Sequence, residues 1–296
     1  MEAKIKKIIR RALDEDIQTG DVTTQAVIPD SVFGKGKFLV KANALIAGLN
    51  VAKNVFEMID DQIDFKILIP DGKKVKTGDI VAEVEGRASS ILTAERTSLN
   101  FLQRMSGIAT LTNNFVEKII HTNAKILDTR KTVPGLRMLD KEAVRLGGGK
   151  NHRIGLFDMF LIKDNHIEIA GSITNAVNAC RNFQQKKNSQ FKIEVETKNL
   201  DEVKEALACD VDIIMLDNFK TEMMKKAVTL INGKCLVEAS GNINIENVKE
   251  VAETGVDYIS VGALTHSVKA LDISFEVELK TIHCAVLIPF LKVTTC

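Results

Sequence analysis

The chain has little of what marks a secreted, membrane or nucleic-acid-binding protein. Its 296 residues include no tryptophan, one tyrosine and four prolines. The five cysteines form no CxxC pair, so we expect reduced thiols in a cytoplasmic protein rather than disulfides or a zinc site. A net charge of +1 creates no global field that would attract nucleic acid or a membrane. No apolar run approaches the roughly 20 residues that a bilayer span requires, and P-loop, GxGxxG and GxSxG motifs are missing.

What the chain does have is an ordinary globular composition, 45% hydrophobic and 27% charged. Its length suits one large domain or two moderate ones. The first 17 residues place isoleucines and leucine on one helical face, without the continuous apolar core of a signal peptide. We expect this helix to dock on a core rather than lie on a membrane surface.

Residues 1–107 predict an α+β sandwich domain. Strand-like runs at 33–40 and 63–69 are followed by tight turns at Asp71-Gly72 and Thr77-Gly78, similar to the swapped hairpins of biotinyl and lipoyl carrier domains. The lysines at these turns are interpreted as solvated side chains rather than prosthetic attachment sites. A helix is then expected with Thr93 as N-cap and Arg96 one turn inside, and a second helix over about 108–119.

From residue 125 onward, short apolar runs alternate with helical patterns. This alternation predicts a parallel sheet, and about six repeats favour a closed or nearly closed α/β barrel over an open doubly wound sheet. The expected strands are 125–127, 159–162, 191–195, 212–216, 235–237 and 258–261.

Polar side chains follow nearly every expected barrel strand. The carboxyl ends of parallel barrel strands open on one mouth, where barrel active sites lie. A functional group at almost every strand end is hard to obtain by chance, so these segments are expected to form the site. They are Asp128-Thr129-Arg130-Lys131, Lys163-Asp164, Glu196, Asp217-Asn218, Glu238-Ala239-Ser240-Gly241 and Gly262.

The cations of this mouth indicate an anionic ligand. Arg130 and Arg153 can bind carboxylates through two parallel hydrogen bonds, and His152 can donate one more. Lys131 and Lys163 are compact charges suited to phosphate, pyrophosphate or carboxylate oxygens. For Lys163, a salt bridge at the barrel end is the alternative.

Two acids, Glu196 and Asp217, lie among these cations. They favour Mg²⁺, held directly or through water or substrate oxygens, or act as acceptors for ribose hydroxyls. An ion pair with Lys163 or Arg130 is the alternative.

The late loops predict a phosphate site. Loops that open helices near the end of a barrel bind phosphate through free backbone N–H groups. His266 is expected to contact pyrophosphate or to cap a helix. The candidate residues are Ser240, Gly241, Asn242, Gly262 and His266.

Three motifs, DTRKTVPG, GGGKNHRIGLFD and LIKDNH, resemble the quinolinate phosphoribosyltransferase family, and the similarity extends to about Val277. The resemblance implies that an incomplete barrel, residues 108–277, follows the N-terminal domain in the sequence. The tail, 278–296, has no counterpart in the family. The family usually has SGGI where this chain has Ser240-Gly241-Asn242-Ile243, so Asn242 departs from the pattern.

The resemblance also implies an activity: phosphoribosyl transfer from phosphoribosyl pyrophosphate (PRPP) to quinolinate with Mg²⁺, giving nicotinate mononucleotide, pyrophosphate and CO₂. Catalytic roles would fall to Lys131, Lys163, Glu196 and Asp217. The family is a homodimer with shared sites, in which Arg96 would join Arg130, His152, Arg153 and Lys163 at quinolinate; a higher oligomer stays open.

The alternatives belong to other classes. One is a nicotinate-specific transferase of the same fold, which the many carboxylate-binding cations disfavour. Another is a Schiff-base lyase that uses Lys163. A third is a non-catalytic sensor of pyridine dicarboxylates, for which Glu196 and Asp217 would be of no use.

Overall fold

The computed structural model describes residues 2–281, which form two compact units. The first unit contains the described residues of Met1–Leu111, Val133–Gly147 and Val268–Cys296, and the second contains Thr112–Thr132 and Gly148–Ser267. These units differ from the expected ranges 1–107, 108–277 and 278–296, because three segments of the expected barrel range, 108–111, 133–147 and 268–277, belong to the first unit.

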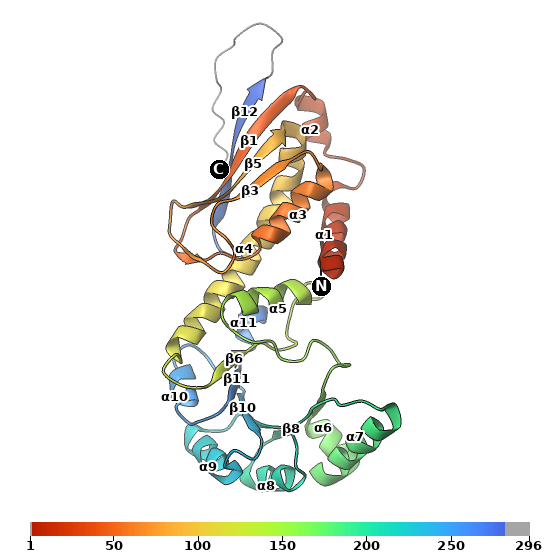
Figure 1. Ribbon diagram of the computed structural model, residues 1–296, viewed down its shortest axis with the longest axis vertical. Helices are drawn as coiled ribbons and strands as arrows, with labels where there is room; N and C mark the ends of the chain where they lie inside the picture. Colours follow the sequence, from red (N-terminus) through yellow and green to blue (C-terminus); the bar gives the residue numbers. More distant parts are fainter. Residues whose placement is uncertain (1, 282–296) are drawn as a thin grey trace. The chain divides into compact units, whose positions relative to one another are not determined.

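An antiparallel sheet in the order β12-β1-β5-β3 organises the first unit (Figure 1). Along β1, buried residues alternate with more exposed ones, as expected for a sheet with one face on a core. That core contains Phe38, Phe56, Phe65 and Phe275, with ring centroids 4.7–6.1 Å apart. A side chain at Gly36 would collide with the Phe275 ring, so glycine allows this ring to lie against the strand. The strands are β1 (Val32–Val40), β3 (Asp64–Ile67), β5 (Ile80–Arg87) and β12 (Ile273–Thr281), with a separate pair β2 (Ala44–Leu45) and β4 (Lys74–Val75).

Strand β12 was not expected. It pairs with β1 over its whole length, from Val40↔Ile273 to Val32↔Thr281. The expected tail therefore begins inside a strand, and its remainder, 282–296, lies outside the described residues.

One long helix replaces the two helices expected around residues 93–119. Helix α4 runs without interruption over Ala88–Lys118. The N-cap prediction for Thr93 was wrong, because Thr93 lies inside this helix, and Arg96 is roughly two turns from its start instead of one. The other helices of the first unit are α1 (Glu2–Ile17), α2 (Val22–Val27), α3 (Leu49–Ile59) and α5 (Arg137–Leu146).

A six-stranded parallel sheet organises the second unit, in the order β6-β11-β10-β9-β8-β7. All six expected strands are present, and the prediction of an incomplete barrel is confirmed, since β6 and β7 are edges that do not pair with each other. The strands are β6 (Lys125–Leu127), β7 (Phe160–Ile162), β8 (Ile193–Thr197), β9 (Ile213–Asp217), β10 (Leu236–Ser240) and β11 (Tyr258–Ser260).

Helices connect these strands, and α7, α8 and α9 follow one another along one side of the sheet (Figure 1). The helices are α6 (Asp164–Ala170), α7 (Ile173–Lys187), α8 (Leu200–Ala208), α9 (Thr221–Ile231), α10 (Val248–Ala252) and α11 (Ala263–His266). Among the described residues, no helix combines the length and apolarity needed to cross a membrane.

Candidate active site

The carboxyl ends of the barrel strands enclose a cavity of about 1020 Å³ within the second unit. The expected strand-end residues line it because parallel strands deliver their carboxyl ends to one edge. Of the strand-end segments, Asp128, Asp164 and Ala239 do not line it. Its lining includes every residue that was given a binding or catalytic role except Arg96, namely Arg130, Lys131, His152, Arg153, Lys163, Glu196, Asp217, Ser240, Gly241, Asn242, Gly262 and His266. Arg96 is an exposed residue of α4 in the other compact unit.

Arg153 lines this cavity, and its guanidinium uses only part of its hydrogen-bonding capacity. Its Nη1 donates to the Met159 carbonyl at 3.1 Å, whereas its buried Nε has no hydrogen-bond partner among the described residues. Burial and the neighbouring Arg130 lower the pKa of Arg153. A buried N–H without a partner is costly, so a ligand carboxylate would complete this site.

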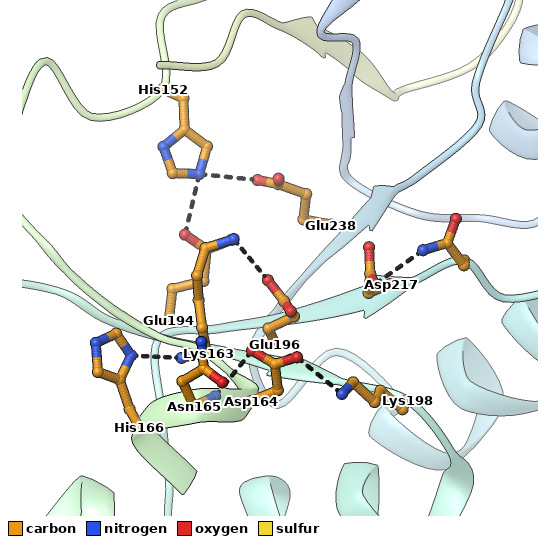
Figure 2. A network of polar contacts seen from close by, with 11 residues as sticks. His152, Lys163, Asp164, Asn165, His166, Glu194, Glu196, Lys198, Asp217 and Glu238 are labelled. Carbon is orange, nitrogen blue, oxygen red and sulfur yellow. Dashed lines mark hydrogen bonds and ion pairs between the residues drawn. The ribbon is translucent and has the colours of Figure 1, made fainter. Parts of the chain in front are cut away.

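Lys163 and Glu196 are paired at the mouth. Lys163 directly follows β7, and its Nζ lies 3.0 Å from Oε2 of Glu196 on the neighbouring strand β8 (Figure 2). The Lys163 side chain is 47% exposed, and that of Glu196 is 10% exposed. This ion pair is the arrangement weighed above as the alternative for both residues.

At the start of α11, just after β11, Gly262 allows a lysine and a histidine to lie close together. A side chain at position 262 would lie 3.2 Å from Cδ of Lys131 and 3.1 Å from the His266 ring. The backbone of Lys131 is held in place by Thr265, whose hydroxyl donates to the Lys131 carbonyl at 2.8 Å. Lys131 and His266 therefore converge on one side of the cavity, next to the start of α11.

Asn242 takes a conformation that suits the glycine usually found there. Its φ is +51°, in the left-handed region that asparagine tolerates better than most residues. Its side-chain amide donates to Oδ1 of Asn218 at 2.9 Å, and Asn218 in turn donates to Oδ2 of Asp217 at 2.9 Å. The departure from the glycine pattern thus adds a hydrogen-bonded link from the β10 loop to the acid at the end of β9.

Two buried glutamates meet the His152 ring; Glu194 was not predicted as a site residue, and Glu238, although part of an expected strand-end segment, was given no role. Glu194 on β8 and Glu238 on β10 are fully buried, and Nε2 of His152 lies 3.0 Å from one carboxylate and 3.5 Å from the other (Figure 2). Burial, and for Glu238 also the neighbouring Glu194, raises the pKa of both carboxyls. The available signal was a charged residue at an interior position of each strand, since acids are rarely fully buried unless paired.

Taken together, a parallel α/β barrel with cations, acids and glycine-rich loops at its carboxyl ends defines an enzyme site for phosphorylated, anionic small molecules. Models of the quinolinate phosphoribosyl transferase C-terminal and N-terminal domains match residues 108–276 and 21–106. The chain belongs to the quinolinate phosphoribosyltransferase family.

Individual relatives agree with this assignment. The chain is 46% identical over 290 residues to quinolinate phosphoribosyltransferase [decarboxylating] 1b of Nicotiana tabacum, covering 93% of this chain and 82% of that one. It is 41% identical to a probable nicotinate-nucleotide pyrophosphorylase [carboxylating] of Bacillus subtilis, over 93% and 94% of the two chains. The structure of the nicotinate-nucleotide pyrophosphorylase from Francisella tularensis superposes with a TM-score of 0.88 at 44% identity, covering 94% and 97%.

Proposed function

We propose that this chain is a pentosyltransferase that moves the phosphoribosyl group of PRPP to quinolinate with decarboxylation, a step of NAD synthesis. One observation carries the proposal. A single cavity collects carboxylate-binding and phosphate-binding groups at the ends of the same strands. The names of relatives that share 41–47% of its residues agree with this activity.

The substrates match the two sides of the cavity. Quinolinate carries two carboxylates beside a ring nitrogen, and Arg130, Arg153 and Lys163 would bind them. PRPP would place its phosphates at Lys131 and at the loops of Gly241 and Gly262. A volume of about 1020 Å³ is large enough for both ligands at once, since single ligand pockets measure about 300–1,000 Å³.

A magnesium ion fits the acids of this site. Glu196 and Asp217 lie on neighbouring parallel strands, where Glu196 pairs with Met215, two residues before Asp217. Mg²⁺ takes one or two carboxylates together with phosphate oxygens. When bound, it would neutralise charge on the pyrophosphate. The fit of two carboxylates on adjacent strands supports Mg²⁺ as the cofactor.

The residues would act by placing charge rather than by forming a covalent bond. Lys131 and His266 would contact the departing pyrophosphate while positive charge builds at the anomeric carbon, as in related displacements. The quinolinate nitrogen then bonds to that carbon. The carboxylate beside the nitrogen leaves as CO₂, and a proton takes its place. Orientation and preorganised charge would supply most of the rate enhancement.

Assembly and location are further parts of the proposal. A homodimer in which Arg96 enters the partner's site would supply an additional bidentate donor for the second carboxylate. The exposed side chain of Arg96 is consistent with such a role. A cytoplasmic location stays a prediction.

The structure bears on one rival activity. A Schiff-base lysine must be neutral to attack a carbonyl, and enzymes achieve this by desolvation or a nearby cation. Lys163 is instead half exposed and forms an ion pair with Glu196, so it is neither desolvated nor placed beside a cation.

A substrate comparison tests the proposal. The protein is incubated with PRPP, Mg²⁺ and either quinolinate or nicotinate, and CO₂ and pyrophosphate are measured. Release of both products is expected in the reaction with quinolinate and not in the reaction with nicotinate. Pyrophosphate release with nicotinate alone would support the nicotinate-specific enzyme. Borohydride trapping of Lys163 with a carbonyl substrate would support the lyase.

A further inference from the structure

The loop that carries His152 and Arg153 has no regular secondary structure, so its shape depends on side chains around it. Buried carboxylates supply these contacts. Asp128, at the end of β6, accepts from the backbone N–H of His152 at 2.8 Å and from the side-chain amide of Asn151 at 2.6 Å. Glu194 holds the other side of the loop through the His152 ring.

The hydrogen bonds at the His152 ring determine where its proton lies. The backbone N–H of Arg153 donates to Nδ1 at 2.7 Å, so Nδ1 must offer its lone pair. In a neutral ring the proton then lies on Nε2. That nitrogen faces Glu194 at 3.0 Å and Glu238 at 3.5 Å. Besides His152, the Ser260 hydroxyl reaches Glu238 and the two carboxyls reach each other, so His152 is the donor from the loop that faces Glu194.

The same geometry argues against reading this cluster as a metal site. His152, Glu194 and Glu238 bring their ligand atoms within 4.8 Å of one another. A metal-bound imidazole, however, gives its lone pair to the ion and donates its other N–H to an acceptor. Here Nδ1 accepts a backbone N–H instead, so Nε2 carries a proton and cannot ligate.

We propose that Glu194 is a positioning residue for quinolinate binding: it fixes the ring and tautomer of His152, which in turn holds the backbone at Arg153, and Glu238 supports the same contact. The chain of contacts runs from β8 through the imidazole to the Arg153 N–H. The guanidinium of Arg153 is thereby held toward the cavity, while the phosphate-binding loops at Gly241 and Gly262 take no part. This inference rests on the proposed function for the identity of the dicarboxylate.

Replacement of Glu194 separates positioning from packing. Glu194→Leu removes the acceptor and fills a similar volume, so it should raise the KM for quinolinate by about tenfold, the value of one strong hydrogen bond, while the KM for PRPP stays close to wild type. Glu194→Gln retains an acceptor oxygen for Nε2–H and should recover most of the loss. Asp212→Asn is the matched control: this carboxylate accepts from the Ile193 N–H at the start of β8, makes no contact with the His152 ring and should not alter the KM for quinolinate. Equal KM values in Glu194→Leu and wild type would overturn the proposal.

A second measurement does not depend on turnover, and its wild-type result does not depend on folding of the leucine variant. The chain has five histidines, so ¹⁵N-histidine spectra of the full-length protein are simple, and His152→Gln identifies the His152 signals. The wild-type ring should be the Nε2–H tautomer, and Glu194→Leu should give a mixture of tautomers. A wild-type Nδ1–H tautomer would overturn the proposal. If wild type fails to use quinolinate at all, the proposed function fails, whereas the tautomer result stands separately.

Discussion

Lys163 and Glu196 form an ion pair between adjacent strand ends, with Nζ 3.0 Å from Oε2. Sequence reasoning assigned the lysine to the substrate and the acid to magnesium. The structure shows the ion pair that was the alternative for both residues, and the assignments to substrate and magnesium stay predictions. Removing one partner of a charge pair leaves the other charge unpaired. Substitution of either residue should therefore affect the binding of both quinolinate and Mg²⁺.

Replacing either acid should reduce turnover and raise the Mg²⁺ requirement, because each change removes a formal charge near the metal and pyrophosphate. Glu196→Gln and Asp217→Asn are expected to lower kcat by at least about tenfold at fixed Mg²⁺. The measurement is kcat as a function of Mg²⁺ concentration. Asp164→Asn is the control, since this exposed acid pairs with Lys198 and does not line the cavity. Wild-type Mg²⁺ dependence in both variants would make the acids structural.

Arg153→Ala should weaken quinolinate binding far more than PRPP binding. Truncating one partner of a desolvated charge pair costs about 2–5 kcal/mol. Arg153→Lys should recover only part of this, because an ammonium lacks the planar fork of guanidinium. Calorimetric titration with each substrate provides the measurement. Arg181→Ala is the control, as this arginine donates to the carbonyls of Cys209 and Asp210 outside the cavity. Equal losses for both substrates would remove Arg153 from the quinolinate site.

If subunits share sites, two inactive variants should restore activity in a mixed dimer. Arg96→Ala and Lys131→Ala should each be nearly inactive. After subunit exchange, half the dimers are mixed and each has one intact site, so recovery should approach roughly a quarter of wild type by two-fold symmetry. Activity is measured before and after exchange, with exchange itself followed by mass-tagged subunits. Proven exchange without recovery would place Arg96 in its own subunit's site or outside the site.

Glu238→Gln should remove a loss of stability that the wild type shows at rising pH. Burial, then Glu194, raises the pKa of Glu238 from 4.5 to about 8. Between pH 4.5 and about 8 the folded protein keeps a proton on Glu238 that the unfolded chain releases. The stability that this proton contributes is fully present below pH 4.5 and is lost as pH rises through about 8. Denaturant unfolding of both proteins between pH 5 and pH 9 should show the variant gaining relative to wild type. The control Glu222→Gln, at an exposed position, should show no such trend. If Glu238→Gln instead loses stability relative to wild type as pH rises, the raised pKa is contradicted.

Asn242 should tolerate glycine and reject β-branched residues. Its φ of +51° costs glycine nothing, so Asn242→Gly should alter the free energy of unfolding by less than about 1 kcal/mol despite losing the bond to Asn218. Asn242→Val should cost about 1–2 kcal/mol and raise the KM for PRPP, since valine would push the loop out of this conformation. Chemical unfolding and PRPP kinetics test both variants. Equal stability of the two would show that the loop does not depend on the left-handed conformation.

Local patterns were sufficient for the barrel. Each of its strands is a short apolar run that ends at a polar residue, and the structure places every such run in the sheet. The cavity lining followed from one rule, that parallel strands share a carboxyl edge. Family motifs supplied the identity of the substrates, which spacing alone left open.

Other features depend on pairing between distant residues. β12 pairs with β1, which lies more than two hundred residues earlier in the sequence. The residue pattern within 273–281 does not indicate which strand it pairs with. The continuity of α4 was missed because Ser106-Gly107 interrupts its apolar positions, and a glycine there is also typical of a boundary between two helices.

The sequence by itself determined the barrel strands, the residues at their ends and the family, because these are properties of short segments. Only the tertiary structure decided that Glu194 and Glu238 meet beneath His152, and that Lys163 pairs with Glu196. The physical reason is that a side chain's partner depends on sheet order and packing. Strands β8 and β10, separated by β9, bring their glutamates to one imidazole only once the sheet has formed.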